Sequence, residues 1–199
     1  MNEIIVNSER SYSVVLDTDF TKEVIAAANG RERIAIIHSD SMKAHIPTFT
    51  GIDAEFFYFG IPDGEAGKSF TTVQRLWDWL GAAGFTRSDL IIGIGGGAVT
   101  DLSGFVAATW LRGLDWIAIP TTVAGMVDAA IGGKTGLNLD AGKNLIGAFH
   151  SPSAVLIDQT FLNSLSERDL KAGMAEVAKC GFIDDTEILD LIEANWKRI

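Results

Sequence analysis

The amino-acid sequence predicts an α/β fold, in which a mostly parallel sheet with flanking helices is followed by the first helix of an α-helical domain. Compact apolar runs recur along the chain, several without polar alternation, as in strands buried on both faces of a parallel sheet. Helical patterns alternate with these runs, which is typical of a doubly wound sheet. The predicted boundaries are an α/β domain over residues 1–165 and a helical segment over residues 166–199.

The predicted elements follow one another in a regular order. Residues 4–6 and 12–16 flank a polar connection and predict a hairpin at a sheet edge. Apolar runs then predict five strands, at residues 33–37, 54–59, 90–94, 116–119 and 154–157. Apolar side chains at helical spacing predict helices over residues 66–83, which end before Gly84, and over residues 98–110.

The pattern changes near residue 166. Ser166, followed by Glu167 and Asp169 in the first turn, is typical of a capped helix start. The helical pattern continues almost to the end of the chain, and its apolar positions need a partner surface that the sequence does not supply. We therefore expect the chain to be the beginning of a longer protein.

Composition excludes several classes of function. Lys and Arg number 16 against 26 Asp and Glu, and the resulting formal charge of -10 repels both nucleic acid and anionic membranes. No stretch is long and apolar enough for a membrane-spanning helix. The single Cys180 can form no internal disulfide, so we expect a cytoplasmic protein without nucleic-acid or membrane partners.

A glycine-rich motif joins the strand at 90–94 to the helix at 98–110. Gly93, Gly95 and Ala98 have the G-x-G-x-x-A spacing that lets backbone N–H groups approach a pyrophosphate, as in a Rossmann-like fold. A tight strand-to-helix turn without a ligand would use the same glycines. The acidic residue that ends the next strand in the usual fingerprint is absent here, because Asp115 precedes that strand.

Two further loops combine charge with open backbone. The loop at 63–68 could bracket a ribose or a phosphate, or form only a capped turn. The glycine-rich segments at 128–136 and 142–144 carry Lys134 and Lys143. Each lysine alone would be an ordinary surface charge, but two in adjoining segments favour a site for an anionic substrate.

The sequence contains no complete metal site. The three histidines, His38, His45 and His150, have no spacing typical of metal ligands. Glu176 and Lys179 share one face of a helix predicted at 171–180 and can form a surface ion pair. Glu176 could still supply one ligand if others came from elsewhere.

Taken in order, these segments resemble the 3-dehydroquinate synthase family. The shared blocks run from about residue 60 to residue 182 and include GGGAVTDLSGFVAAT at 95–109, LRG at 111–113, PTT at 120–122, VD at 127–128, GGKTG at 132–136, GKNLIGAF at 142–149 and AEV at 175–177. The resemblance implies a lyase of the shikimate pathway of aromatic amino acid biosynthesis. It would convert 3-deoxy-D-arabino-heptulosonate 7-phosphate to 3-dehydroquinate and phosphate, with NAD reduced and restored in each turnover.

The resemblance also implies which residues bind the cofactor and the metal. The implied NAD contacts are Asp63, Gly64, Glu65 and Lys68, then Gly97, Ala98, Val99, Thr100 and Asp101, and then Thr121, Thr122, Lys134, Lys143, Phe161, Leu162, Asn163 and Ser164. Glu176 matches the family's zinc-binding glutamate, so zinc or cobalt is the expected metal.

Further residues match the family's substrate site. Asp128, Lys134, Asn144 and Lys179 would face the phosphorylated sugar acid. Lys134 and Asn144 are placed to hold its phosphate, and Asp128 would either orient Lys134 or relay a proton. Arg112 matches a residue thought to reach the phosphate pocket across a homodimer.

The chain also departs from the family pattern. Val127-Asp128-Ala129-Ala130 lacks two hydroxyl groups of the family block, and the histidines that complete the zinc site are expected beyond Ile199. We therefore expect the chain alone to be inactive. The alternatives are a related sugar phosphate cyclase, a metal-dependent alcohol dehydrogenase of similar architecture, and a non-catalytic nucleotide-binding module.

Overall fold

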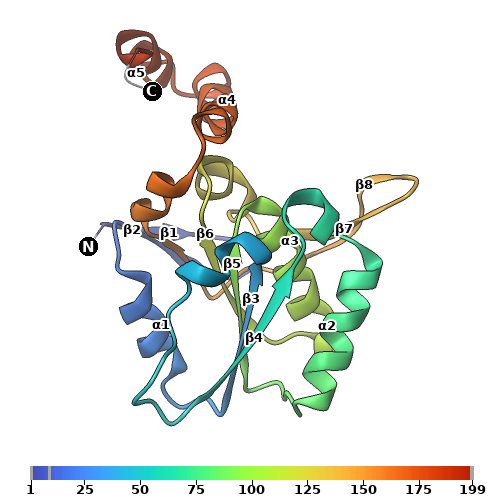
Figure 1. Cartoon of the computed structure of the whole chain (residues 1–199). Coiled ribbons are helices and arrows are strands. Elements are labelled where there is room, and N and C mark those ends of the chain that lie inside the picture. The colour runs from blue at the N-terminus through green and yellow to red at the C-terminus, as the bar shows by residue number, and fades with distance from the viewer. Residues whose placement is uncertain (1, 9, 198–199) are drawn as a thin grey trace.

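The computed structural model describes residues 2–8 and 10–197 and confirms the predicted fold class. Met1, Glu9, Arg198 and Ile199 belong to the predicted domain ends and hairpin connection and lie outside the described residues. Figure 1 shows a central sheet with α1 (Phe20–Ala28) on one side and α2 (Phe70–Ala82) and α3 (Gly97–Thr109) on the other. Within the described part of the chain, no helix is long and apolar enough to cross a membrane.

The main sheet contains seven strands among the described residues. Their spatial order is β1 (Asn2–Val6), β2 (Tyr12–Leu16), β9 (Ala154–Ile157), β6 (Asp115–Pro120), β5 (Leu90–Gly95), β3 (Arg33–Ser39) and β4 (Glu55–Ile61). β1 and β2 form the predicted antiparallel hairpin at one edge, and every other neighbouring pair is parallel. The chain adds strands in one direction from β3 to β4 and in the other from β5 onward. The switch point therefore lies between β3 and β5, where ligands bind in doubly wound sheets.

The core is built around β5. Ile92 is 0% exposed and is in register with Ile36 of β3 and Ile117 of β6. On the other face, a Cβ at Gly93 would lie 2.7 Å from Ser103 Cβ, and one at Gly95 would lie 2.5 Å from Val99 Cγ2. These two glycines therefore let α3 pack directly on the strand.

The helix predicted over residues 66–83 begins later than expected. Residues Gly64–Gly67 form a short 3-10 helix, η2, and α2 begins at Phe70 after Ser69, whose Oγ accepts a hydrogen bond from Thr72 N at 3.3 Å. A Cβ at Gly67 would lie 2.3 Å from the carbonyl oxygen of Pro62. The chain folds back on Pro62 here, so the first residues of the predicted helix belong to a separate turn.

β4 differs from the other predicted strands because it is not buried on both faces. It forms the sheet edge opposite β1, and Tyr58 is 40% exposed. Its apolar character comes from aromatic side chains that pack against α2 and the following turn, with Phe59 and Trp79 ring centroids 5.1 Å apart and Phe57 and Phe85 5.3 Å apart. Aromatic packing over an edge strand thus produces the same sequence pattern as full burial.

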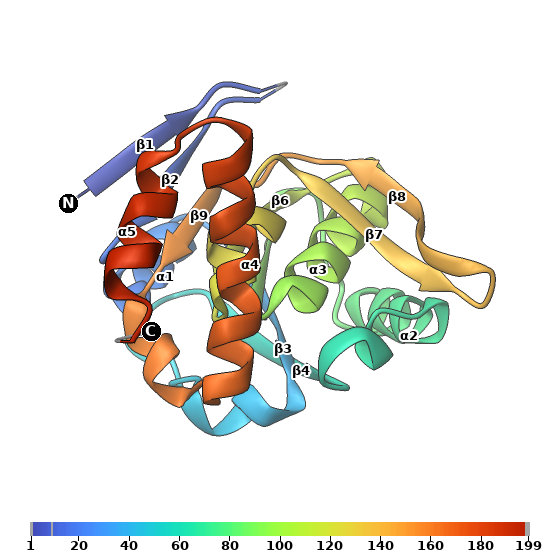
Figure 2. The ribbon, with the colours of Figure 1, turned by 90° about the horizontal axis from the view of Figure 1, so that it is seen from above.

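Several elements were not anticipated from the sequence. α1 begins after Asp19, whose side chain accepts from Thr21 N, and buries Phe20, Val24 and Ala28 on one face. The glycine-rich segments form a separate antiparallel hairpin, β7 (Lys134–Leu139) and β8 (Gly142–Phe149), which projects from the body beside α2 and α3 (Figure 2). The remaining short helices are η1 (Asp40–His45), η3 (Trp110–Arg112), the π-helical turn η4 (Gly125–Ala129) and η5 (Gln159–Ser164).

The predicted C-terminal helical segment forms two helices. α4 (Glu167–Ile183) starts at the predicted cap, where Ser166 Oγ accepts from Asp169 N at 3.1 Å, and α5 (Glu187–Asn195) follows after a short break. The two helices lie side by side above the sheet in both views (Figures 1 and 2). Apolar side chains remain on their surface, with Phe182 80% exposed and Ile183 74% exposed.

Asp115 ties three segments together at the amino end of β6. Its two carboxylate oxygens accept hydrogen bonds from Arg10 Nη1 and Arg31 Nη2, both at 2.7 Å. Burial raises the pKa of Asp115, but the two guanidinium groups outweigh it, so the pKa lies below its ordinary value. The stabilisation is therefore present above the pKa of the unfolded chain and is lost as the pH falls through the folded-state pKa.

We expect Asp115→Asn to lower the free energy of unfolding by about 1.5–3 kcal/mol at neutral pH, because the amide keeps one acceptor, turns an NH2 group toward the other guanidinium and carries no charge to pair with either arginine. The difference from the unsubstituted chain should begin to shrink as the pH falls below about 4, where the carboxylate of the unfolded chain becomes protonated, and should vanish below the lower pKa of the folded chain. Urea unfolding at pH 7 and at pH 3 measures both values. Asp140→Asn, at an exposed position in the β7–β8 turn, should change neither. An equal loss at both pH values would show that the carboxylate charge is not responsible.

Candidate active site

A cavity of about 1090 Å³ opens at the carboxyl ends of the parallel strands, at the switch point of the sheet. Each strand there supplies lining residues: Ser39 ends β3, Asp63 follows β4, Gly96 follows β5 and Thr121 follows β6. Asp169 and Glu176 of α4 line the cavity from above. Segments far apart in the sequence therefore meet in one site.

The glycine-rich motif divides between packing and ligand access. Gly93 and Gly95 lie beneath α3, whereas Gly96 and Gly97 line the cavity. The N-cap residue is Gly96, so no side chain caps the start of α3. The Gly96 carbonyl accepts a hydrogen bond from Val99 N at 2.9 Å. The N–H groups of the two residues before Val99 are orphan donors of the helix start, which suits them to an anionic group.

The end of β3 and the loop after β4 form one polar corner of the cavity. Asp63 accepts hydrogen bonds from Ser41 Oγ at 2.5 Å and from Ser41 N at 3.3 Å, and Ser39 lies on the same wall. The loop at 63–68 is therefore fixed to the end of β3 by these hydrogen bonds. Ser41 follows a buried parallel strand in the sequence. Ligands bind beyond the carboxyl ends of such strands, so this position alone makes Ser41 a candidate for a ligand contact.

A buried charge cluster joins the loop at 63–68 to the β7–β8 hairpin. Lys68 is 2% exposed, and its ammonium donates to Asp101 and, at 2.5 Å, to Asn144 Oδ1. Burial raises the pKa of Asp101 above its ordinary value, although the neighbouring Lys68 opposes the shift. The pair places opposite charges where the cavity meets α3.

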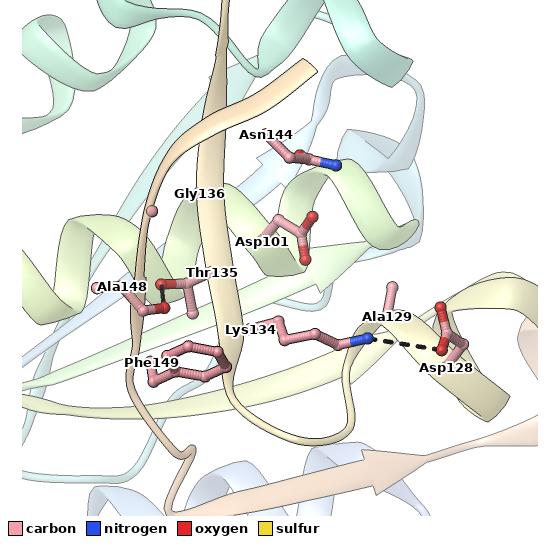
Figure 3. Close-up of a pocket in the computed structure, with 10 residues that line it drawn as sticks. Asp101, Asp128, Ala129, Lys134, Thr135, Gly136, Asn144, Ala148 and Phe149 are labelled. Carbon is pink, nitrogen blue, oxygen red and sulfur yellow. Dashed lines mark hydrogen bonds and ion pairs between the residues drawn. The ribbon is translucent and has the colours of Figure 1, made fainter. Parts of the chain in front are cut away.

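A chain of alternating charges crosses from the π-helical turn to α4. Asp128 Oδ1 lies 3.7 Å from Lys134 Nζ and 3.1 Å from Lys179 Nζ, and Lys179 also pairs with Glu176, as the helix spacing predicted. Hydrogen bonds to Glu176 and Asp128 raise the pKa of Lys179. Figure 3 shows Lys134 directed toward Asp128 across a second cavity of about 380 Å³. Asp101, Asp128, Ala129 and Asn144 line both cavities.

Most of the predicted site residues meet in these two cavities. The lining residues among them are Asp63, Gly64, Glu65, Lys68, Gly97, Ala98, Val99, Asp101, Thr121, Thr122, Asp128, Lys134, Lys143, Asn144, Ser164 and Glu176. The sequence did not point to Met42, His45, Ala124 or Asp169, which also line the larger cavity. Met42 and His45 come from η1, whose short and irregular pattern gives no signal of its own.

Other predicted site residues lie elsewhere. Thr100 is buried and donates to Gly97 O, and the Phe161 ring packs against Phe20 with centroids 5.1 Å apart. Leu162 and Asn163 do not line the cavities of the described chain. Lys179 reaches the site through Asp128. Arg112 is exposed in η3, at the end of α3 remote from the cavity.

The described ranges contain no cluster of three or more His, Cys, Asp or Glu side chains that could hold a metal ion. Glu176 lines the larger cavity and is paired with Lys179. A catalytic zinc takes three protein ligands, so these residues alone do not fit a complete metal centre.

The fold and its cavity define a Rossmann-like α/β domain with a large cavity at the switch point of the sheet. A family model described as 3-dehydroquinate synthase N-terminal matches residues 58–172. The 3-dehydroquinate synthase of Mycolicibacterium vanbaalenii is 48% identical over 96% of this chain and 54% of the relative. The chain belongs to the 3-dehydroquinate synthase family and spans about half the length of the curated relatives it matches.

Solved structures of sugar phosphate cyclases share the fold. ValA, a 2-epi-5-epi-valiolone synthase from Streptomyces hygroscopicus subsp. jinggangensis 5008 with NAD+ and Zn2+ bound, has a TM-score of 0.84 and 32% identity over 96% of this chain and 55% of that one. A 2-deoxy-scyllo-inosose synthase complexed with carbaglucose-6-phosphate, NAD+ and Co2+ has a TM-score of 0.80 and 26% identity over 89% of this chain and 50% of that one.

Proposed function

We propose that this chain forms the cofactor-binding part of a 3-dehydroquinate synthase. The complete enzyme would convert 3-deoxy-D-arabino-heptulosonate 7-phosphate to 3-dehydroquinate and phosphate. The observation that carries the proposal is the switch-point cavity, in which residues predicted from separate family blocks meet. The 48% identity to a named 3-dehydroquinate synthase supports the same assignment.

NAD fits the larger cavity by the chemistry of its lining. The glycine-rich start of α3 offers backbone donors to a pyrophosphate, and Asp63 with Ser39 and Ser41 offers hydrogen-bond partners to a ribose at the carboxyl ends of β3 and β4. When bound, NAD supplies a hydride acceptor for a substrate hydroxyl. The two structures reported above with NAD+ bound support this cofactor.

The anionic substrate would lie where the two cavities meet. Lys134 and Asn144 would hold its phosphate, since an ammonium and an amide N–H are both suited to a phosphate oxygen. Asp128 would orient Lys134 and Lys179, because its carboxylate lies between their ammonium groups. This placement favours orientation by Asp128 over proton relay.

Glu176 would supply one ligand of a catalytic zinc or cobalt, as the structures with Zn2+ and Co2+ suggest. The remaining ligands would come from the part of the relatives that this chain does not span. We also place the domain boundary between residues 165 and 166. A cytoplasmic location is proposed because the single Cys180 can form no internal disulfide.

A homodimer would explain the position of Arg112. α3 has 13 residues and is therefore about 20 Å long, and Arg112 lies just beyond the end remote from the cavity. From there its guanidinium is far from the Asn144 region of its own chain. A second copy could bring Arg112 to a neighbouring phosphate pocket.

Calorimetric titration with NAD, run beside NADP, tests the cofactor assignment. We expect the chain to bind NAD, and to bind NADP more weakly because the Asp63 carboxylate would repel a 2′-phosphate. Asp63→Asn should narrow the gap between the two cofactors, and the exposed Asp140→Asn control should leave it unchanged. No NAD binding to a chain that circular dichroism shows to be folded would contradict the assignment.

Phosphate release tests the proposed division of the active site. The chain alone should release no phosphate from the sugar acid, because the described residues bring a single predicted metal ligand to the cavity. A version extended by the missing half of a curated relative should gain activity. Turnover by the purified chain alone would refute this division, and an inactive extended protein that binds NAD and zinc would refute the reaction.

A further inference from the structure

Lys68 is buried, although it belongs to the loop at 63–68 that lines the larger cavity. Its side chain is 3% exposed, so the ammonium does not face open solvent. It lies between the Asp101 carboxylate at the start of α3 and the Asn144 carboxamide at the tip of the β7–β8 hairpin. One buried cation therefore connects the wall expected to hold the cofactor with the residue expected to face the substrate.

The contact with Lys68 fixes which way the Asn144 amide points. A lysine ammonium has three donors and no acceptor, so the atom of Asn144 that faces it must be the carbonyl Oδ1, 2.5 Å away. The Nδ2 group is then directed to the other side. Asn144 is exposed and lines both cavities, and Figure 3 shows its nitrogen pointing away from the hairpin.

The backbone around Asn144 is fastened independently. Asn138 N donates to Lys68 O at 2.8 Å, and Asn138 Nδ2 donates to Glu65 Oε2 at 2.5 Å. Asn138 Oδ1 in turn accepts from Asn144 N at 3.0 Å, which holds Asn144 at a φ of 56°. Because the backbone of Asn144 is held in this way, only its side-chain amide remains free to rotate. The hydrogen bond from Lys68 to Oδ1 fixes the orientation of that amide.

We propose that Lys68 is a positioning residue that acts through Asn144, turning its amide so that Nδ2 donates to an oxyanion of the substrate. This inference rests on the proposed function of the site. The ammonium of Lys68 is already engaged by two acceptors, and the neighbouring Asp101 carboxylate offsets its charge. Lys134, whose side chain is 59% exposed and lies 3.7 Å from Asp128, provides the charge for the same oxyanion.

Titration of the 15N-labelled chain with inorganic phosphate, and separately with acetate, tests the proposal by NMR. The Asn144 side-chain NH2 resonance should shift on saturation with phosphate; a shift with acetate instead would assign the subsite to a carboxylate. Asn144→Asp keeps an acceptor for Lys68 but replaces the donor by a carboxylate that repels the anion, so oxyanion affinity should fall at least about tenfold. Lys43→Met, which removes an exposed lysine, is the charge control.

A double-mutant cycle separates positioning from direct charge. Lys68→Met should weaken phosphate binding in the unsubstituted chain but have no further effect in an Asn144→Ala background, and Lys68→Arg should restore part of the affinity. Equal losses in both backgrounds, or an unmoved NH2 resonance, would overturn the proposal. If Lys68→Met fails to fold, Lys68→Arg takes its place in the cycle: a loss in the unsubstituted chain that vanishes in the Asn144→Ala background supports the proposal, and an equal loss in both backgrounds overturns it. A chain that binds phosphate in this manner but not NAD would contradict the proposed function and leave the positioning role intact.

Discussion

Replacing Ile92 by alanine is expected to lower the free energy of unfolding by about 2–5 kcal/mol. Ile92 is 0% exposed at the centre of β5 and lies in register with Ile36 and Ile117 on the neighbouring strands. Its removal loses the transfer free energy of the side chain and leaves a cavity that three strands held by ladder hydrogen bonds cannot close.

Urea unfolding followed by circular dichroism measures this effect. The urea concentration at the midpoint of unfolding should fall, while the slope of the unfolding free energy against urea concentration stays the same. This is expected when stability changes without a change in the surface exposed on unfolding. Ile5→Ala makes the same chemical change on the edge strand β1, where Ile5 is 55% exposed, and should cost less than about 1 kcal/mol. Similar losses at both positions would mean that β5 is not the centre of the core.

Replacing Gly97 by valine is expected to weaken NAD binding by about 10- to 100-fold. A Cβ at this position would lie 2.8 Å from the Cβ of Ala129, in the turn that carries Asp128. The larger side chain would push the start of α3 away from that turn and intrude on the cavity that both segments line. Overpacking of this kind costs about 1–3 kcal/mol, and each 1.4 kcal/mol corresponds to a tenfold change in affinity.

Calorimetry with NAD measures the loss, and Gly81→Ala is the matched control. Gly81 lies in α2, away from the cavity, and a Cβ there would meet Trp110 at an ordinary contact distance of 3.4 Å. This control should bind NAD as the unsubstituted chain does and be equally or more stable, since alanine favours a helix. Unchanged NAD affinity in the Gly97→Val chain would place the cofactor elsewhere in the cavity.

Elements with a strong local signal were predictable, whereas those defined by distant contacts were not. The strand at 90–94 and the helix at 98–110 carry continuous apolar patterns and appear in the structure as β5 and α3. The β7–β8 hairpin was missed because both strands contain glycines and charged residues, and because most side chains of β8 are exposed. The edge position of β4 was missed because its partly buried aromatic side chains give the same apolar pattern as a strand covered on both faces.

The sequence by itself determined the fold class, the family and most of the residues of the site, because ordered motifs and apolar periodicity are local properties of the chain. Only the tertiary structure decided how those residues act together. It separated Gly93 and Gly95, which support α3, from Gly97, which lines the cavity. It also brought Lys68 to Asn144, 76 positions away. Spacing along the chain carries no information about such contacts, because they arise where parallel strands end side by side and their loops converge.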